Sequence, residues 1–151
     1  MRKIFIAAAL CALMHVPSLA QDNAAVMARV QQFVGGFNRG DTKAAAAACA
    51  DQISIIDDFP PHAWSGAGAF EKWMNDFDAD SKKNGIADAV VTLGKPRHVA
   101  VTGDRAYVVV PADYTYKQNG KAMKETGSIW TIVLQKSAAG WRIVAWAWAQ
   151  N

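Results

Sequence analysis

Residues 30–58 read VQQFVGGFNRGDTKAAAAACADQISIIDD, and they predict two helices followed by a strand. The apolar residues of the first helix recur at helical spacing: Val26, Val30, Phe33 and Phe37. The break at Gly40-Asp41 ends this helix. The alanine-rich run from Thr42 to Ala50 favours a second helix, because alanine has the highest helix propensity. The alternation from Ile53 to Asp57 then predicts a strand.

Asp57 is the residue of this stretch with the strongest claim to chemistry. If Ile53 and Ile55 face the core, alternation places Asp57 on the same side and leaves Asp58 as a solvated turn residue. Burial raises the pKa of a carboxyl, so Asp57 can serve as a general base or acid. In the alternative interpretation, Asp57 accepts hydrogen bonds from the loop of residues 59–62 and only orders it. The sequence leaves both interpretations open.

The rest of the chain changes from helices to strands. A loop from Asp58 to Trp64 leads to a third helix that carries Phe70, Trp73 and Phe77 on one face. Four long strands follow, over residues 86–102, 106–117, 123–135 and 141–149. The first of them is interrupted at Gly94-Lys95-Pro96. Asn119-Gly120 is a hairpin signal. The prediction is an α+β domain with three N-terminal helices packed on a strongly bent antiparallel sheet.

The N-terminus has the pattern of a secretory signal peptide. A basic start, an apolar run and the small residues Ser18-Leu19-Ala20 predict cleavage after Ala20, which leaves one domain of residues 21–151. No other segment approaches the length that spans a membrane, so we expect a secreted, periplasmic protein. Cys49 is the single cysteine of that domain, which excludes an internal disulfide.

The charged residues point away from nucleic acids and metals. The 16 basic and 13 acidic residues are scattered, so no basic patch predicts nucleic-acid binding. No histidines or cysteines have the spacing of metal ligands, and we expect neither a metal nor an organic cofactor. Asp76, Asp78 and Asp80 alternate like the start of a calcium loop, but Ser81 replaces its required glycine. We assign these three aspartates to a solvated helix face.

The chain resembles the nuclear transport factor 2-like superfamily, which includes ketosteroid isomerases, scytalone dehydratase, polyketide cyclases and SnoaL-like proteins. The order of elements agrees, and three segments resemble the bacterial ketosteroid isomerase pattern: 30–41, 50–51 and 65–66. The resemblance implies a cone-shaped fold whose concave side forms an apolar cup. It also implies that Asp57 occupies the position of the isomerase's proton-transferring aspartate.

The same resemblance argues against steroid isomerisation. Phe33 falls where the isomerase carries its oxyanion-stabilising tyrosine, and the segment Thr126 to Trp130 has no aspartate for the second donor. The loss of even one such donor typically costs about 3 kcal/mol of transition-state stabilisation. The ending from Gly140 to Trp148 resembles secreted SnoaL-like proteins of no assigned activity.

Further side chains are candidates for the cup. His62 can form an acid-base dyad with Asp57, although a loop histidine is more often a surface residue. Glu125 is favoured as an outward-facing residue paired with Lys124 or Lys121. On the strand 106–117, Tyr107 and Asp113 face one side and Tyr114 and Tyr116 the other, and the sequence does not choose the side that faces the cup.

Trp146 and Trp148 alternate with alanines on the last strand. If the alanines line the cup, the tryptophans cover the outer sheet face and mark a dimer contact. If the tryptophans face inward, they fill the cup. The family resemblance favours the first arrangement, and with it a homodimer.

We therefore predict a secreted SnoaL-like domain whose apolar cup binds a small hydrophobic or amphipathic molecule. The leading activity is cofactor-free isomerisation or dehydration, with Asp57 as base and His62 or a tyrosine hydroxyl as acid. The alternative is a non-catalytic binding module or a homodimeric interaction module. Besides Asp57 and His62, we expect these residues at the cup: Phe33, Phe37, Ile55, Trp64, Trp73, Tyr107, Asp113 and Trp130.

Overall fold

The computed structural model describes residues 19–151. The elements in chain order are α1 (Leu19–Asn38), α2 (Thr42–Ala46), β1 (Cys49–Ile56), β2 (Ala63–Ala67), α3 (Ala69–Asn84), β3 (Ile86–Leu93), β4 (His98–Thr102), β5 (Arg105–Gln118), β6 (Lys121–Ser137) and β7 (Gly140–Ala149). The predicted α+β class is confirmed. The predicted signal peptide lies outside the described residues except for its last two, so the predicted cleavage point falls in the first turn of α1.

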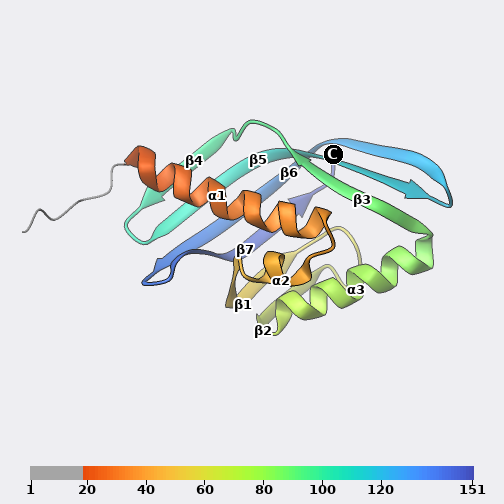
Figure 1. Ribbon diagram of the computed structural model, residues 1–151, viewed down its shortest axis with the longest axis horizontal. Coiled ribbons are helices and arrows are strands. Elements are labelled where there is room, and N and C mark those ends of the chain that lie inside the picture. The colour runs from red at the N-terminus through yellow and green to blue at the C-terminus, as the bar shows by residue number, and fades with distance from the viewer. Residues whose placement is uncertain (1–18) are drawn as a thin grey trace, which may run out of the picture.

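One curved, unclosed sheet holds the strands in the order β2-β1-β7-β6-β5-β3, and β4 pairs with β5 beyond the end of β3 (Figure 1). All neighbours are antiparallel except β1 and β7, which run parallel. The sheet is therefore mixed and not wholly antiparallel as predicted. In Figure 1, α1 lies across the long strands and α3 runs beside β1 and β2. No helix in residues 19–151 is long and apolar enough to cross a membrane.

Helices α1 and α2 meet closely at Gly36. A Cβ atom at this position would lie 2.5 Å from the backbone nitrogen of Ala45, so only glycine permits the contact. Asp41 caps α2 by accepting a hydrogen bond of 2.9 Å from the Ala44 amide. The helix ends at Ala46 and not at Ala50 as predicted. Ala48 instead accepts a hydrogen bond of 2.9 Å from Ile143 on β7, so sheet pairing overrides the helix propensity of alanine.

The strand β2 was not predicted. It pairs with β1 as an antiparallel hairpin that sets Trp64 opposite Ile55. Trp64 is the one fully buried residue of β2, so the strand lacks the repeated alternation that identifies strands in a sequence. The predicted loop is consequently shorter than expected and ends before Ala63.

The tryptophans of β7 face inward, which corrects the arrangement that the family resemblance favoured. Trp146 is 4% exposed, and its ring centre lies 5.0 Å from that of Phe33 and 5.2 Å from that of Trp73. The pairing of β6 with β7 shifts register at Val144, so Ile143 and Trp146 are both buried although they are three positions apart. Trp148 is half-buried on the same side.

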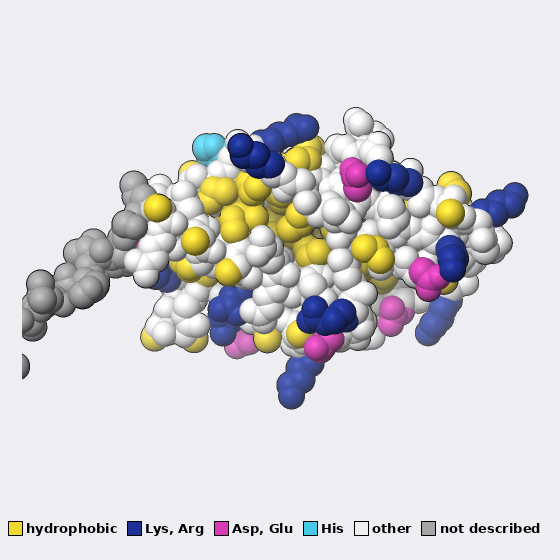
Figure 2. Space-filling model, turned by 45° about the horizontal axis from the view of Figure 1, so that its top comes forward, with side chains coloured by type: hydrophobic (Ala, Val, Ile, Leu, Met, Phe, Trp, Pro, Cys, Tyr) yellow, Lys and Arg dark blue, Asp and Glu magenta, His cyan; other side chains and the backbone are white. Residues whose placement is uncertain are grey.

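At the edge of the core, a side chain of α1 is bonded to β3, and some hydrophobic side chains remain partly exposed. The Asn38 side chain, at the end of α1, donates a hydrogen bond of 2.8 Å to the Val91 carbonyl and accepts one of 2.9 Å from the Val91 amide. This pair ties α1 to β3. Figure 2 shows hydrophobic side chains on the surface between α1 and the β4 region, where Met27, Val99 and Val101 pack against the core while partly exposed.

Candidate functional site

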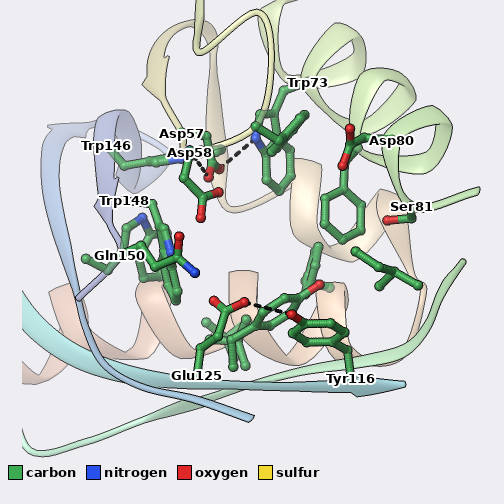
Figure 3. Close-up of a pocket in the computed structure, with 18 of the residues that line it drawn as sticks. Asp57, Asp58, Trp73, Asp80, Ser81, Tyr116, Glu125, Trp146, Trp148 and Gln150 are labelled. Carbon is green, nitrogen blue, oxygen red and sulfur yellow. Dashed lines mark hydrogen bonds between the residues drawn. The ribbon is translucent and has the colours of Figure 1, made fainter. Parts of the chain in front are cut away.

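A pocket of about 290 Å³ lies between α1, α3 and the sheet (Figure 3). Its lining consists of aromatic rings, a few aliphatic or small polar side chains, and carboxylates: Phe33, Val34, Phe37, Asp57, Asp58, Phe59, Trp73, Phe77, Asp80, Ser81, Ile86, Val91, Tyr114, Tyr116, Glu125, Trp130, Trp146, Trp148 and Gln150. Figure 3 shows Asp57 and Asp58 on one side of the pocket and Glu125 with Tyr116 on the opposite side.

Asp57 follows the last residue of β1 and presents its carboxylate to the pocket. Oδ2 accepts a hydrogen bond of 2.9 Å from the Trp73 indole, and Oδ1 accepts one of 2.9 Å from the Asp58 amide. Burial nevertheless raises the pKa of Asp57 to about 7, aided by the neighbouring Asp58 carboxyl, because these two hydrogen bonds offset only part of the desolvation. Near neutral pH, Asp57 can therefore both accept a proton and return it.

The loop after Asp57 is held through its backbone. The Asp57 amide donates to the His62 carbonyl at 3.0 Å, and the His62 amide donates to the Phe59 carbonyl at 2.9 Å. Within residues 19–151, no loop residue beyond Asp58 donates a hydrogen bond to the Asp57 carboxylate. The carboxylate is thus not what orders residues 59–62.

His62 does not form the predicted dyad. Its side chain is exposed and does not line the pocket, and its Nδ1 lies 3.2 Å from the Asp57 backbone carbonyl and not from the carboxylate. Of the acids predicted to act with Asp57, only the tyrosine hydroxyls of Tyr114 and Tyr116 line the pocket.

Tyrosines from β5 occupy the far side of the pocket. The Tyr116 hydroxyl donates a hydrogen bond of 2.9 Å to Glu125. The Tyr114 hydroxyl is buried and has no hydrogen-bond partner among residues 19–151. Burial, and next the charge of Glu125, raise the pKa of Tyr114, so this hydroxyl stays protonated. An unpaired phenol is a donor ready for an oxygen of a bound molecule.

Glu125 reaches the pocket because of a β-bulge. Strand β5 faces β6 with Ala112 opposite Ser128, but Tyr114 lies opposite Glu125, so β6 contains one extra residue between them. Gly127, at φ +78°, supplies the backbone conformation of this bulge. Glu125 is therefore half-buried beside Tyr116, which corrects its assignment as an outward partner of Lys124 or Lys121.

Five of the residues expected at the cup lie together in the pocket wall: Phe33, Phe37, Asp57, Trp73 and Trp130. Four others do not. Ile55 is buried in the core behind the wall, and Trp64 is buried with its indole donating to Asp76 at 2.8 Å. Tyr107 and Asp113 lie on the side of β5 away from the pocket, where Tyr107 is 44% exposed and Asp113 pairs with Lys124 at 3.1 Å.

Several lining residues escaped the sequence analysis. Asp58 is exposed, as predicted for a solvated turn residue, but it also lines the pocket. Asp80 was assigned to a solvated helix face and lines the pocket as well. Phe59 and Phe77 complete the aromatic wall together with Trp148, whose inward placement was the less favoured alternative. The spacing of Phe77 from Phe70 and Trp73 on one helix face was the signal available for it. No group of three or more His, Cys, Asp or Glu residues within 19–151 is arranged to hold a metal ion.

Comparison with known proteins gives a consistent picture. The family model described as the SnoaL-like domain matches residues 26–148. No curated protein matches the chain.

Solved structures of the nuclear transport factor 2-like superfamily share the fold. A superfamily protein from Salmonella enterica has 16% identity and a TM-score of 0.74, with 89% of this chain and 94% of that chain covered. A dehydratase candidate from Streptomyces avermitilis has 18% identity and a TM-score of 0.70, with 87% and 98% covered. A ketosteroid isomerase-like protein from Erwinia carotovora atroseptica has 20% identity and a TM-score of 0.67, with 86% and 96% covered. At these identities the likeness concerns the fold.

Proposed function

The chain belongs to the SnoaL-like domain family, and from this premise we propose that its pocket binds a small amphipathic molecule and transfers a proton within it, without a cofactor. One observation carries the proposal. Asp57, with a pKa raised to about 7 by burial, faces an aromatic pocket whose far side holds the unpaired hydroxyl of Tyr114. A base of matched pKa opposite a hydrogen-bond donor is the arrangement that proton transfer next to a carbonyl requires.

The roles follow from the two sides of the pocket. Ionised Asp57 removes a proton from a carbon next to a carbonyl group, and the Tyr114 hydroxyl stabilises the oxygen on which negative charge develops. Protonated Asp57 then returns the proton to another carbon, which completes an isomerisation. In a dehydration, protonated Asp57 gives the proton to the departing hydroxyl, which leaves as water, and the Tyr114 hydroxyl remains the donor to the carbonyl oxygen.

The fold relatives favour this class of reaction. The names of two structural neighbours refer to a dehydratase and to ketosteroid isomerase, both proton-transfer enzymes. Phe33 lines the pocket but carries no donor, so the Tyr114 hydroxyl on β5 takes the role that the isomerase gives to a tyrosine at the Phe33 position.

Hydrogen exchange in D₂O tests the proposal without knowledge of the natural substrate. Small aromatic ketones such as 2-tetralone are incubated with the protein, and NMR follows loss of the protons next to the carbonyl. We expect wild-type protein to accelerate exchange, and Asp57→Asn to reduce that acceleration about a hundredfold or more. Asp78→Asn, an exposed acid on α3 outside the pocket, serves as the control.

The possible outcomes are distinct. Equal exchange by wild type and Asp57→Asn would overturn the role of Asp57. Binding of the ketones without exchange would instead favour the alternative function, a non-catalytic binding module.

We also propose a homodimer, formed through the outer face of the sheet. Val90 and Tyr107 lie on that face and are 38% and 44% exposed, and exposed apolar area is typical of interfaces. Trp146 and Trp148, which first suggested the dimer, line the pocket and cannot serve. Light scattering tests the proposal. We expect wild-type protein to be a dimer and the Tyr107→Lys variant to be a folded monomer. A monomeric wild type would refute the proposal.

A further inference from the structure

The pocket has an unbalanced charge. Its lining contains ten aromatic rings and four carboxylates, but no Lys, Arg or His side chain. We propose that the molecule it binds is an organic cation: an amine or quaternary ammonium group attached to an apolar body. This inference rests on the proposed function only in assuming that the pocket is a small-molecule site.

The pocket carboxylates have polar neighbours but no cationic ones. Asp57 accepts from the Trp73 indole, Glu125 from the Tyr116 hydroxyl, and Asp80 from the Asn84 amide at 2.9 Å. Among residues 19–151, no side-chain nitrogen of Lys, Arg or His lies within 4.0 Å of the carboxylate oxygens of these three residues or of Asp58. By contrast, five acids outside the pocket within residues 19–151 pair with cations, among them Asp88 with Lys117 at 2.8 Å and Asp76 with Lys72 at 2.6 Å.

The carboxylates surround the space rather than sharing one wall. Asp57 and Asp58 come from the end of β1, Asp80 from α3 and Glu125 from β6, and Figure 3 shows them on three sides of the opening. A cation in the pocket therefore feels attraction from several directions. Carboxylates on separate walls, without cations of their own, favour a ligand that carries the charge.

The walls between the carboxylates suit an organic cation better than a metal ion. Four tryptophans line the pocket: Trp73, Trp130, Trp146 and Trp148. The face of an indole ring attracts an alkylammonium group that comes within about 6 Å, and indole is the strongest side chain for this interaction. Aromatic carbons offer a metal ion no ligand atoms, and the described residues contain no group of ligands arranged for one.

The charge also argues against the other classes of small molecule. An anion would meet four carboxylates and no cation. A neutral ligand such as a ketone displaces water from these carboxylates without providing a charge in return, so a cation with the same apolar body should bind more tightly. An amphipathic amine satisfies both the rings and the acids.

Three ligands with one apolar body separate these possibilities: 2-(1-naphthyl)ethylamine, 2-(1-naphthyl)ethanol and 1-naphthylacetate. Isothermal titration calorimetry of wild-type protein at neutral pH measures their affinities. We expect the amine to bind at least about tenfold more tightly than the alcohol, and the acetate to bind more weakly than both.

Matched variants then assign the preference to the pocket. Asp80→Asn and Glu125→Gln are each expected to weaken binding of the amine about three- to tenfold, with little change for the alcohol. Asp78→Asn, from the same helix as Asp80 but outside the pocket, should leave both affinities unchanged. Circular dichroism checks that each variant is folded.

Each result decides between the inference and the proposed function. If the alcohol or the acetate binds as tightly as the amine, the cation inference is overturned while the small-molecule pocket stands. If none of the three binds, both are overturned for ligands of this size. If Asp78→Asn weakens the amine as much as Asp80→Asn does, the attraction comes from the overall charge of the protein and the inference fails.

Discussion

The indole of Trp73 donates a hydrogen bond of 2.9 Å to Oδ2 of Asp57, so a ring of the pocket wall also controls the acid that faces the pocket. This bond favours the ionised carboxylate and works against the burial that raises its pKa. The pKa of Asp57, at about 7, thus reflects a balance between burial in apolar surroundings, which raises it, and two hydrogen-bond donors, which lower it. Changes to either side of the balance are measurable.

Replacement of Trp73 by Phe removes the donor while keeping an aromatic ring. We expect the pKa of Asp57 to rise above about 7, because a hydrogen bond to the charged form is lost. Carbon-13 NMR titration of the side-chain carboxyls measures the change. Trp64→Phe is the matched control, since Trp64 makes the same kind of bond to Asp76 outside the pocket. An unchanged Asp57 titration in Trp73→Phe would contradict the assignment.

The raised pKa of Asp57 predicts a dependence of stability on pH. From about pH 4 to about pH 7 the folded protein retains a proton that the unfolded chain has released, so this group lowers stability as the pH rises. Asp57→Asn should have nearly wild-type stability at pH 4 and be more stable by about 1 to 3 kcal/mol at pH 8. Urea unfolding at the two pH values measures this difference. A variant less stable than wild type at pH 8 would show that the carboxylate is a structural acceptor.

Tyr114 and Tyr116 should respond in opposite ways to removal of the hydroxyl. Tyr114→Phe removes a buried hydroxyl without a partner among residues 19–151, and we expect a gain of about 1 kcal/mol in the free energy of unfolding. Tyr116→Phe removes the hydrogen bond to Glu125, and we expect a loss of about 1 kcal/mol. Urea unfolding compares them. Destabilisation by Tyr114→Phe would mean that its hydroxyl is bonded in the folded protein.

Trp146 is a core residue in the structure and should behave as one. Trp146→Ala is expected to lower the free energy of unfolding by about 3 to 5 kcal/mol, because the ring is 4% exposed and packs against Phe33 and Trp73. Met123→Ala, at a residue 41% exposed, should change it by less than about 0.5 kcal/mol. A stable, monomeric Trp146→Ala protein would support the earlier view of Trp146 as an interface residue.

Export is a further proposal, and it rests on the sequence pattern of residues 1–20. Full-length protein expressed in a Gram-negative bacterium should be recovered from the periplasm with a mass that corresponds to a chain beginning at Gln21. Mutation of Ala20 to Arg should block the cleavage. Recovery of uncleaved wild-type protein from the cytoplasm alone would refute export.

Much of the fold could be predicted from local periodicity. The stripe from Val26 to Phe37 predicted α1, and the Asn119-Gly120 turn between β5 and β6 is where the sequence indicated. The alternation of Ile53 and Ile55 also predicted that Asp57 faces inward, and the structure places its carboxylate in the pocket wall. These predictions were correct because each pattern depends only on residues a few positions apart in the sequence.

The outward placement of Trp146 was wrong because the family resemblance favoured the alanine face of β7 for the cup. Glu125 was missed because one inserted residue changes the side on which the chain faces: the bulge near Gly127 turns Glu125 toward the pocket. Strict alternation cannot register such an insertion, because a slip of one residue exchanges the two faces of a strand. Asp58 and Asp80 were missed for another reason: their surroundings come from elements distant in the sequence.

The single parallel pair of the sheet has a consequence for how the chain reaches its folded state. Cys49 on β1 pairs with Ile143 on β7, so the strand that ends at Asp57 obtains that neighbour only after almost the whole chain is present. During synthesis, or while the chain is still extended, one edge of β1 has no partner. Closing so long a loop is slow, since its entropic cost precedes the contacts that reward it. We therefore expect the pairing of β1 with β7 to be among the last events of folding.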